Sequence, residues 1–339
     1  MTTIIVEAPN RLELRDVAPV PPKAGEVQIK VRRAGICGSD IHIVHGSNPF
    51  AKYPRVIGHE FAGEISALGD GVVGLEIGDR VVADPVIACG HCALCKAGRP
   101  NVCTNLQVIG VHHDGGFRDF ATVPAANAIK VPADMPFEIA ALAEPFSVGA
   151  NILSRTGCSA EDSVLIFGAG TAGLTVLQIA KLHGARCLVS DPDEARRERA
   201  TFLGADVTID PGAETLEGVA TAKTGGFGPS VVIDAAGVPA LLDQACHVVG
   251  SGGRIGLLGF SGAPSNLDQR EVNRKELAVF GSRLNRRLIP QVVQWLQDEL
   301  LQPLEMISHV FSSKEARTAF DLIQNAPQST LKVQLTFNS

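Results

Sequence analysis

Four of the eight cysteines in this chain lie close together in the segment CGHCALCKAGRPNVC, residues 89–103. They are Cys89, Cys92, Cys95 and Cys103, and we expect them to be reduced, because the N-terminus does not read as a secretory signal. Clustered reduced thiols are usually metal ligands, and this spacing suits a closed tetrahedral zinc site. A four-iron cluster is the alternative, but its bacterial pattern closes with three residues and Cys-Pro, whereas a longer turn intervenes here. The segment therefore predicts a structural zinc.

A second group of possible metal ligands is spread over three segments. Cys37 lies in AGICGSDIH, His59 and Glu60 are adjacent in GHE, and Glu144 lies in LAEPFSVG. A cysteine, a histidine and a carboxylate can hold zinc with one position left open, which is the arrangement of a catalytic zinc. Either Glu60 or Glu144 could supply the carboxylate, and the sequence leaves that choice open.

The segment VLIFGAGTAGL carries a glycine pattern typical of dinucleotide binding. Gly168, Gly170 and Gly173 form G-x-G-x-x-G between an apolar stretch and a predicted helix. They would allow a tight turn, a close approach of the pyrophosphate and close helix–strand packing. Asp191 follows the next apolar stretch, at about the 20-residue distance expected of an acid that binds the ribose 2′-hydroxyl. Because a carboxylate there repels a 2′-phosphate, we predict NAD rather than NADP.

The chain divides into two parts with different sequence patterns, and each pattern predicts different secondary-structure elements. Up to about residue 145, short apolar stretches are interrupted by Gly, Pro and Asp, which indicates a β-rich domain of short strands. From about residue 160, strand-like stretches alternate with helical ones, which predicts an α/β domain with a doubly wound parallel sheet. Six strands are predicted there, starting near Ser163, Arg186, Asp206, Ser230, Gly253 and Glu276.

The length and the net charge of the chain limit the number of domains and the kinds of partner to be expected. A chain of 339 residues exceeds the roughly 250–300 at which single cores stop growing, so two domains are expected. We predict a dinucleotide-binding domain over 147–286 and a discontinuous catalytic domain over 1–146 and 287–339, completed by amphipathic helices after about residue 290. The net charge of −6, with no long run of Lys or Arg, argues against nucleic acid or an anionic membrane as partner. We expect a cytoplasmic protein that acts on a small molecule.

Taken together, these segments resemble the zinc-dependent medium-chain alcohol and polyol dehydrogenases, the family of sorbitol dehydrogenase. GICGSDIH, GHEFAGEI, GDRV, the cysteine segment, GGF, EPFSVG and GAGTAGL occur in the family's order over essentially the whole length. NPFAKYPRVIGHE, IGVHHDGGF and GSRLN look most like the starvation-sensing and L-galactonate dehydrogenases of bacteria. Thr171 and Ala172 depart from the Pro-Ile that the family often has inside the glycine loop, with all three glycines kept.

The resemblance implies a GroES-like catalytic domain, a Rossmann domain, and two zinc ions per chain, one catalytic and one structural. Cys37, His59 and Glu144 would hold the catalytic zinc, with Glu60 as an alternating ligand or a partner beside it. Zinc would lower the pKa of a substrate hydroxyl. Ser39 would take the hydroxyl proton, and His42 would pass it to solvent through the cofactor ribose.

The substrate class is inferred from the close resemblance. The close resemblance favours hydride transfer to NAD from a secondary alcohol of a sugar acid, a hexonate of the galactonate or mannonate type, with a polyol as the alternative. A sugar acid needs a cation for its carboxylate, for which Arg55, Arg118, Arg283 and the polar His112 are candidates. A zinc- and NAD-binding regulator without turnover is the alternative of another class. The last predicted strand would offer a sheet edge for a homodimer or homotetramer.

Overall fold

A computed structural model describes residues 1–337, which divide into two compact units. Unit 1 contains Met1–Glu144, Asn285–Glu299 and the chain from Pro303 onward, and unit 2 contains Pro145–Leu284 and Leu300–Gln302. The segment after residue 284 thus returns to the unit formed by the N-terminal part of the chain. The long helix α4 (Ala143–Thr156) begins in unit 1 and continues in unit 2.

Unit 2 is built on a six-stranded, wholly parallel sheet in the order β13-β12-β11-β14-β15-β16. The strands are β11 (Ser163–Phe167), β12 (Arg186–Ser190), β13 (Val207–Ile209), β14 (Val231–Asp234), β15 (Arg254–Leu257) and β16 (Ala278–Gly281). Each lies within a stretch from which a strand was expected, so the predicted doubly wound sheet is confirmed. The strand order reverses between β11 and β14, and ligands bind outside the carboxyl ends of the strands at such a point.

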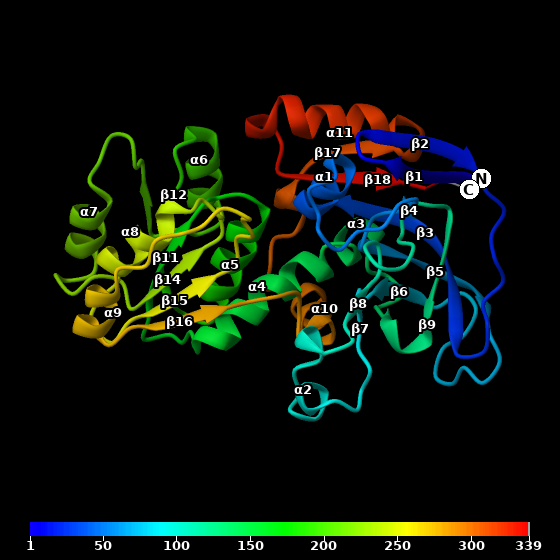
Figure 1. The fold of residues 1–339 in the computed structure, drawn as a ribbon, viewed down its shortest axis with the longest axis horizontal. Coiled ribbons are helices and arrows are strands. Elements are labelled where there is room, and N and C mark those ends of the chain that lie inside the picture. The colour runs from blue at the N-terminus through cyan, green and yellow to red at the C-terminus, as the bar shows by residue number, and fades with distance from the viewer. Residues whose placement is uncertain (338–339) are drawn as a thin grey trace. The chain divides into compact units, whose positions relative to one another are not determined.

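Helices cover both faces of this sheet, as Figure 1 shows for α7, α8 and α9 on one side and α4 and α5 on the other. The helices of this unit besides α4 are α5 (Thr171–Leu182), α6 (Glu194–Phe202), α7 (Leu216–Lys223), α8 (Ala240–Val248) and α9 (Gln269–Lys275). Leu165, Val232 and Ile255 of the sheet pack with Ala220 of α7 and Ala245 of α8 in one buried cluster. Burial on both faces explains why these strands are nearly continuous apolar runs rather than alternating ones.

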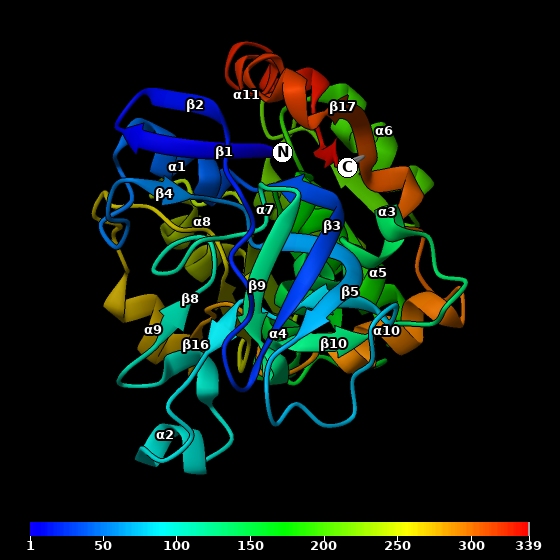
Figure 2. The same cartoon turned by 90° about the vertical axis from the view of Figure 1, so that its right-hand side faces the viewer.

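Unit 1 is rich in short strands, as the Gly and Pro punctuation predicts. Its largest sheet has seven strands, in the order β10-β6-β5-β3-β18-β17 with β9 also paired to β3, and β3, β5, β9 and β10 are visible in Figure 2. A second sheet has the order β2-β1-β4, and β7 pairs with β8. The strands are β1 (Thr2–Ala8), β2 (Arg11–Asp16), β3 (Glu26–Ile36), β4 (Arg55–Val56), β5 (Glu60–Leu68), β6 (Arg80–Ala83), β7 (Val86–Ile87), β8 (Gln107–Val108), β9 (Phe120–Pro124), β10 (Ala128–Lys130), β17 (Ile307–Ser312) and β18 (Lys332–Thr336).

The helices of unit 1 are short, and two come from the returning segment. They are α1 (Gly38–His45), α2 (Ala93–Lys96), α3 (Phe137–Ala140), α10 (Ile289–Gln297) and α11 (Ala316–Asn325), with single 3₁₀ turns at Pro100–Val102, Ala125–Asn127, Leu304–Met306, Ser313–Glu315 and Pro327–Ser329. Ala316, Ala319 and Phe320 are the buried residues of α11, at the spacing of one helix face. The amphipathic pattern expected after residue 290 is therefore confirmed for α11.

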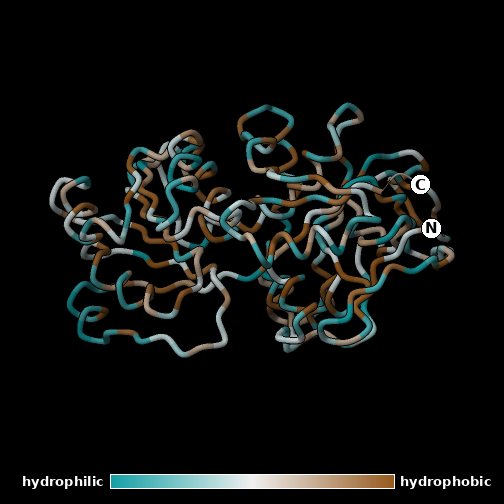
Figure 3. The backbone as a smooth tube through the Cα atoms, turned by 90° about the horizontal axis from the view of Figure 1, so that it is seen from above, coloured by the Kyte–Doolittle hydropathy of each residue, from teal (hydrophilic) through white to brown (hydrophobic). Residues whose placement is uncertain are grey.

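Colouring by hydropathy separates the packed strands from the outer loops. In Figure 3 brown hydrophobic stretches run through the interior of the trace, and many outer loops are teal. Within residues 1–337 no helix has the length and apolar character needed to cross a membrane.

Candidate metal centres and dinucleotide site

The pairing of β3 with β5 brings the first group of predicted ligands together. Gly35 of β3 lies opposite Glu60, the first residue of β5, in an antiparallel register. Cys37 follows β3 directly as the N-cap of α1, and His59 directly precedes β5. One ligand atom each of Cys37, His59 and Glu60 lies within 4.8 Å of the other two. A thiol, an imidazole and a carboxylate so close together fit the donor set of zinc.

Glu144 belongs to the same electrostatic neighbourhood. It lies in the first turn of α4 and is 3% exposed. Burial raises the pKa of Glu144 to about 7, while the charge of His59 lowers it and that of Glu60 raises it. His59, Glu60 and Glu144 therefore influence one another electrostatically, while the ligand atoms that lie within 4.8 Å of one another belong to Cys37, His59 and Glu60.

Asp40 is a residue of this centre that the sequence analysis missed. Its carboxylate is fully buried and accepts hydrogen bonds from the backbone N–H of Cys37 at 2.9 Å and of Gly58 at 3.2 Å. It also lies 3.6 Å from Nδ1 of His59. Burial alone would lower the pKa of His59, but the negative charge of Asp40 raises it well above its usual range. Because Asp40 faces Nδ1, it leaves Nε2 of His59 for a metal.

Asp40→Asn is expected to weaken metal binding at this centre by about 10- to 100-fold, because such carboxylate partners orient a ligating histidine and make it more basic. Titration of the metal-free protein with zinc in the presence of a competing chelator measures this loss. The exposed Asp16 offers a matched control, and Asp16→Asn should bind zinc as the unaltered protein does. Equal affinities of Asp40→Asn and the unaltered protein would contradict this role.

Lys332 is a second residue that the sequence analysis missed. It begins β18, which pairs with β3 on the side away from β5, and it is 2% exposed. Its Nζ donates to both carboxylate oxygens of Glu60, at 2.8 Å and 2.6 Å. A buried lysine facing a buried glutamate 272 residues away has no local sequence signal.

The predicted proton-relay residues both lie on α1, three positions apart, so they share one side of the helix. Ser39 is half-buried and His42 is exposed. Nδ1 of His42 lies 3.0 Å from Oγ of Ser47. The chain thus places a histidine at the surface one helical turn beyond Ser39.

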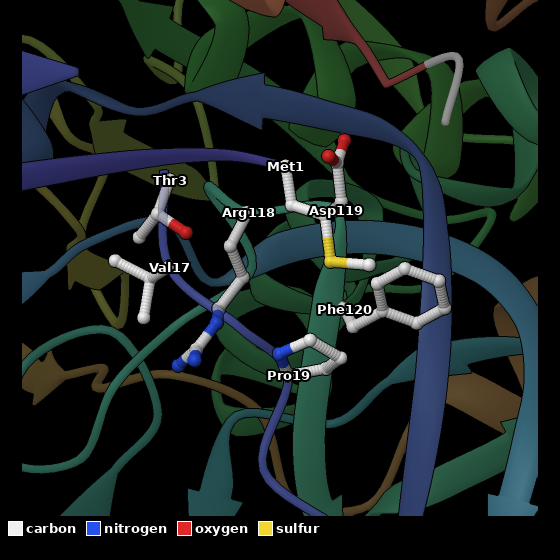
Figure 4. Close-up of a pocket in the computed structure, with 7 residues that line it drawn as sticks. All are labelled: Met1, Thr3, Val17, Pro19, Arg118, Asp119 and Phe120. Atoms are coloured by element: carbon white, nitrogen blue, oxygen red, sulfur yellow. The ribbon is translucent and has the colours of Figure 1, made fainter. Parts of the chain in front are cut away.

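Two of the arginines proposed to bind a substrate carboxylate are engaged with the chain's own carboxylate. Nη1 of Arg55 lies 2.9 Å from Asp114, and Nη1 of Arg118 lies 3.7 Å from it. Figure 4 shows Arg118 in a small pocket with Met1, Thr3, Val17 and Pro19, none of them a residue of the metal centre. The geometry therefore gives these two arginines a structural role. The third, Arg283, lies in unit 2.

His112 is the remaining polar candidate for the substrate carboxylate. Its Nδ1 accepts a hydrogen bond from the backbone N–H of Val108 at 3.1 Å. A ring nitrogen that accepts carries no proton, so this bond favours the tautomer with Nε2–H as donor. The ring lies near that of Phe50, with 6.3 Å between their centroids.

The four clustered cysteines form a second possible metal centre, with one sulfur of each within 4.8 Å of the others. Sγ of Cys89 lies 4.0 Å from Sγ of Cys95, and Sγ of Cys92 lies 3.9 Å from Sγ of Cys103. Backbone N–H groups of Thr104 and Cys95 lower the pKa of Cys92 to about 5, which favours the thiolate that binds metal. Figures 1 and 2 both show α2, which carries Cys95, at the end of a loop that extends away from the sheets of unit 1. The predicted tetrahedral thiolate cage is geometrically feasible.

The glycine loop of unit 2 lies between β11 and α5, as predicted. Gly168 has a φ of +90°, the left-handed conformation that glycine adopts at little cost. A Cβ on Gly170 would meet no atom within 4 Å, so the backbone there is open to a ligand. A Cβ on Gly173 would overlap the carbonyl of Gly168, which explains the need for a third glycine. Thr171 and Ala172 begin α5, whose N-terminus suits a pyrophosphate.

Asp191 directly follows β12 and is 4% exposed. Its Oδ2 accepts from the backbone N–H of Ala169 in the glycine loop at 2.7 Å, and its Oδ1 accepts from Asp193 N–H at 2.9 Å. Each carboxylate oxygen has two lone pairs, so both oxygens can accept a further hydrogen bond. Asp191 therefore fixes the glycine loop in addition to the role that the sequence predicts for it.

Comparisons with known proteins agree with the resemblance seen in the sequence. Residues 23–133 match the family model of the alcohol dehydrogenase GroES-like domain, and residues 172–298 match that of zinc-binding dehydrogenase. The starvation-sensing protein RspB of Escherichia coli (strain K12) is 44% identical over 340 residues, covering 100% of both chains. L-galactonate-5-dehydrogenase of the same strain is 37% identical over 284 residues, which cover 84% of this chain and 83% of that one.

Among solved structures, an alcohol dehydrogenase (rspB) from E. coli CFT073 in complex with NADH superposes with a TM-score of 0.94, at 43% identity and 99% coverage of both chains. The resemblance inferred from the motifs is therefore confirmed. This chain belongs to the zinc-binding, medium-chain alcohol dehydrogenase family.

Proposed function

We propose that this enzyme oxidises a secondary alcohol group of a sugar acid, with NAD as hydride acceptor and two zinc ions per chain. The observation that carries the proposal is the convergence of Cys37, His59 and Glu60 within 4.8 Å of one another. Such a cluster fits a catalytic zinc with an open position, and Glu144 beside it supplies a further carboxylate. Cys89, Cys92, Cys95 and Cys103 fit a structural zinc without one.

When bound, the catalytic zinc would supply a Lewis acid that lowers the pKa of the substrate hydroxyl, and NAD would accept the hydride. The chain's own residues transfer the proton of the substrate hydroxyl. Ser39, two residues after Cys37, accepts the proton from the substrate hydroxyl as it passes its own hydroxyl proton on toward His42, and the exposed His42 on the same side of α1 releases a proton to solvent. Asp40 keeps His59 oriented throughout.

The preference for NAD rests on Asp191, together with Gly168, Gly170 and Gly173. A carboxylate at the end of the second strand accepts hydrogen bonds from ribose hydroxyls and repels a 2′-phosphate. The hydrogen bond from Ala169 to Asp191 holds that carboxylate against the glycine loop, where the ribose would follow the pyrophosphate. The NADH complex of the similar E. coli structure supports the same choice.

The sugar-acid class rests on relatives. L-galactonate-5-dehydrogenase of E. coli and 2-dehydro-3-deoxy-L-galactonate 5-dehydrogenase of Pseudoalteromonas atlantica are 37% and 35% identical. A polyol is the second candidate, favoured by the fold match to galactitol-1-phosphate dehydrogenase of E. coli at 29% identity. Arg55 and Arg118 are both engaged by Asp114, which makes them poor candidates for binding the substrate carboxylate.

The initial rate of nicotinamide reduction by zinc-replete protein tests the proposal. A panel of hexonates of the galactonate and mannonate type, and of polyols, is assayed with NAD and with NADP. We expect turnover of a hexonate with NAD as the preferred cofactor. Turnover of polyols alone would show that the substrate is a polyol and not a sugar acid. Two zinc ions, NAD binding and no turnover across the panel would favour a zinc- and NAD-binding regulator.

We also expect the enzyme to act in the cytoplasm as a homodimer or homotetramer. β16 is the edge strand of the sheet in unit 2, and its Val279 is 39% exposed. Exposed strand edges are usually covered by another chain or element, and a second copy pairing along β16 would cover this one. Light scattering at micromolar concentration should give a mass of two or four chains, and a monomer would contradict the expectation.

A further inference from the structure

We propose that Asp210 is a second determinant of the preference for NAD, acting as a positioning residue through Arg197. Its ion pair with Arg197 engages the guanidinium group, so that this group is not available to a 2′-phosphate beside Asp191. The inference rests on the proposed function, in which Asp191 binds the ribose of NAD. It adds a residue of the next strand end to the discrimination between the two cofactors.

Asp191 and Asp210 stand at the ends of neighbouring strands. Each directly follows its strand, β12 and β13, and the two strands pair in parallel with Ser190 opposite Ile209. The backbone N–H of Asp191 donates to the carbonyl oxygen of Ile209 at 3.3 Å. The two acids are therefore neighbours at the carboxyl edge of the sheet, where a dinucleotide binds in folds of this kind.

Arg197 connects the two strand ends. It lies in α6, the helix that follows β12. Its Nη1 donates to the carbonyl oxygen of Asp191 at 2.8 Å, and its Nη2 lies 3.1 Å from Oδ2 of Asp210. The Arg197 and Asp210 side chains are 16% and 32% exposed. Both terminal nitrogens of the guanidinium group are thus engaged by acceptors of the chain itself.

An arginine in this place is a potential ligand of a 2′-phosphate. In dinucleotide-binding folds that take NADP, an arginine near the end of the second strand accommodates this phosphate. The guanidinium group suits the task because two of its N–H groups can bind two phosphate oxygens at once. In this chain Asp210 competes for the same donors. Two carboxylates, Asp191 and Asp210, against one guanidinium also leave a net negative charge that disfavours a 2′-phosphate.

The ion pair can be broken without dismantling the turn that carries Asp210. Oδ1 of Asp210 accepts from the N–H of Gly212 at 2.9 Å, and its carbonyl oxygen accepts from the N–H groups of Ala213 and Glu214 at 3.2 Å and 3.0 Å. Asp210→Asn keeps an oxygen for Gly212 and replaces the other with an amide nitrogen, which cannot accept from Arg197. A partly exposed ion pair contributes little to stability, so the variant should fold.

The first test measures the binding of ADP-ribose and of its 2′-phosphorylated form by calorimetry, so it does not depend on turnover. The unaltered protein should bind ADP-ribose more tightly. Asp210→Asn should strengthen binding of the 2′-phosphorylated ligand relative to ADP-ribose by about 10-fold or more, the value of one charge-assisted hydrogen bond. Asp134→Asn, which removes an exposed carboxylate from unit 1, should leave the ratio of the two affinities unchanged.

The second test asks whether that gain depends on Arg197. Arg197→Met added to Asp210→Asn should abolish the gain, because no guanidinium is left to bind the phosphate. Arg197→Met alone should widen the preference for ADP-ribose, because Asp210 then lacks its counter-charge. Arg199→Met, which removes an exposed arginine of the same helix, should keep the original ratio. A pair with a purely structural role would instead weaken both ligands together and leave the ratio unchanged.

Two results would overturn the inference. One is an affinity ratio that Asp210→Asn does not shift; should that variant bind neither ligand, an unchanged ratio in Arg197→Met would count equally against it. The other is a gain by Asp210→Asn that persists when Arg197 is replaced. Failure of the proposed function is distinguishable, because it would appear in the unaltered protein, as absent turnover of hexonates or as tighter binding of the 2′-phosphorylated ligand.

Discussion

Cys37→Ser is expected to lower turnover by about a thousandfold or more and to reduce the zinc content from two ions per chain to one. Cys37 is the only thiol in the cluster that it forms with His59 and Glu60. A bound metal supplies several kcal/mol of charge stabilisation to such a reaction, and each 1.36 kcal/mol corresponds to about a factor of ten in rate. Serine is a poor substitute, because its hydroxyl does not ionise to a strong zinc ligand near neutral pH. Metal analysis and initial rates with NAD measure both effects.

Cys158→Ser is the matched control for this substitution. Cys158 is half-buried like Cys37 but lies in unit 2, outside both metal clusters. Burial raises the pKa of its thiol to about 11, so it is a neutral side chain at physiological pH. The control should retain two zinc ions and the original rate. Full activity of Cys37→Ser with one zinc remaining would show that the catalytic metal lies elsewhere or is not required.

Cys103→Ala is expected to remove the other zinc ion and to open the segment 89–103 while leaving the catalytic zinc bound. The four sulfurs draw together both ends of this segment, and the short helix α2 between them contains no buried residue. The binding energy of a structural zinc contributes directly to folding, so its loss should unfold the segment locally. Limited proteolysis within residues 89–103 should become about 100-fold faster or more, because opening then costs several kcal/mol less.

His91→Ala controls for a change within the same segment. His91 is exposed, and its ring contacts the carbonyl oxygen of Cys89 rather than any sulfur. The control should keep both zinc ions and the original cleavage rate. Should Cys103→Ala be cleaved no faster than His91→Ala, the four-cysteine site would have no role in holding its segment together.

Local patterns accounted for much of the fold and for the glycine loop. The strands of unit 2 are buried on both faces, so they stand out as apolar runs between helical stretches. The roles assigned to Gly168, Gly170 and Gly173 depend on a turn, an open backbone and a close approach within a few residues of each other, and such short-range geometry follows from spacing alone. The four-cysteine site could be predicted for the same reason, because all four cysteines lie within residues 89–103.

The partners of the metal centre could not be predicted in this way. Asp40 stands three residues after Cys37, but its contact with His59 depends on where β5 begins relative to β3. Lys332 reaches Glu60 only because β18 joins the sheet beside β3. The ion pairs of Arg55 and Arg118 could not be predicted either, because their partner Asp114 belongs to a loop whose position depends on the tertiary fold. Pairings between distant strands are not encoded in the spacing of either partner.

The place of β18 beside β3 has a consequence for biosynthesis. Residues 332–336 leave the ribosome after all of unit 2, yet they lie next to β3, which is translated before any of unit 2. Contacts over such a separation carry a large entropic cost of loop closure and form late. The buried ion pair between Lys332 and Glu60 therefore forms only after β18 has joined the sheet. Glu60 thus gains its buried counter-charge from a residue that is translated 272 positions later.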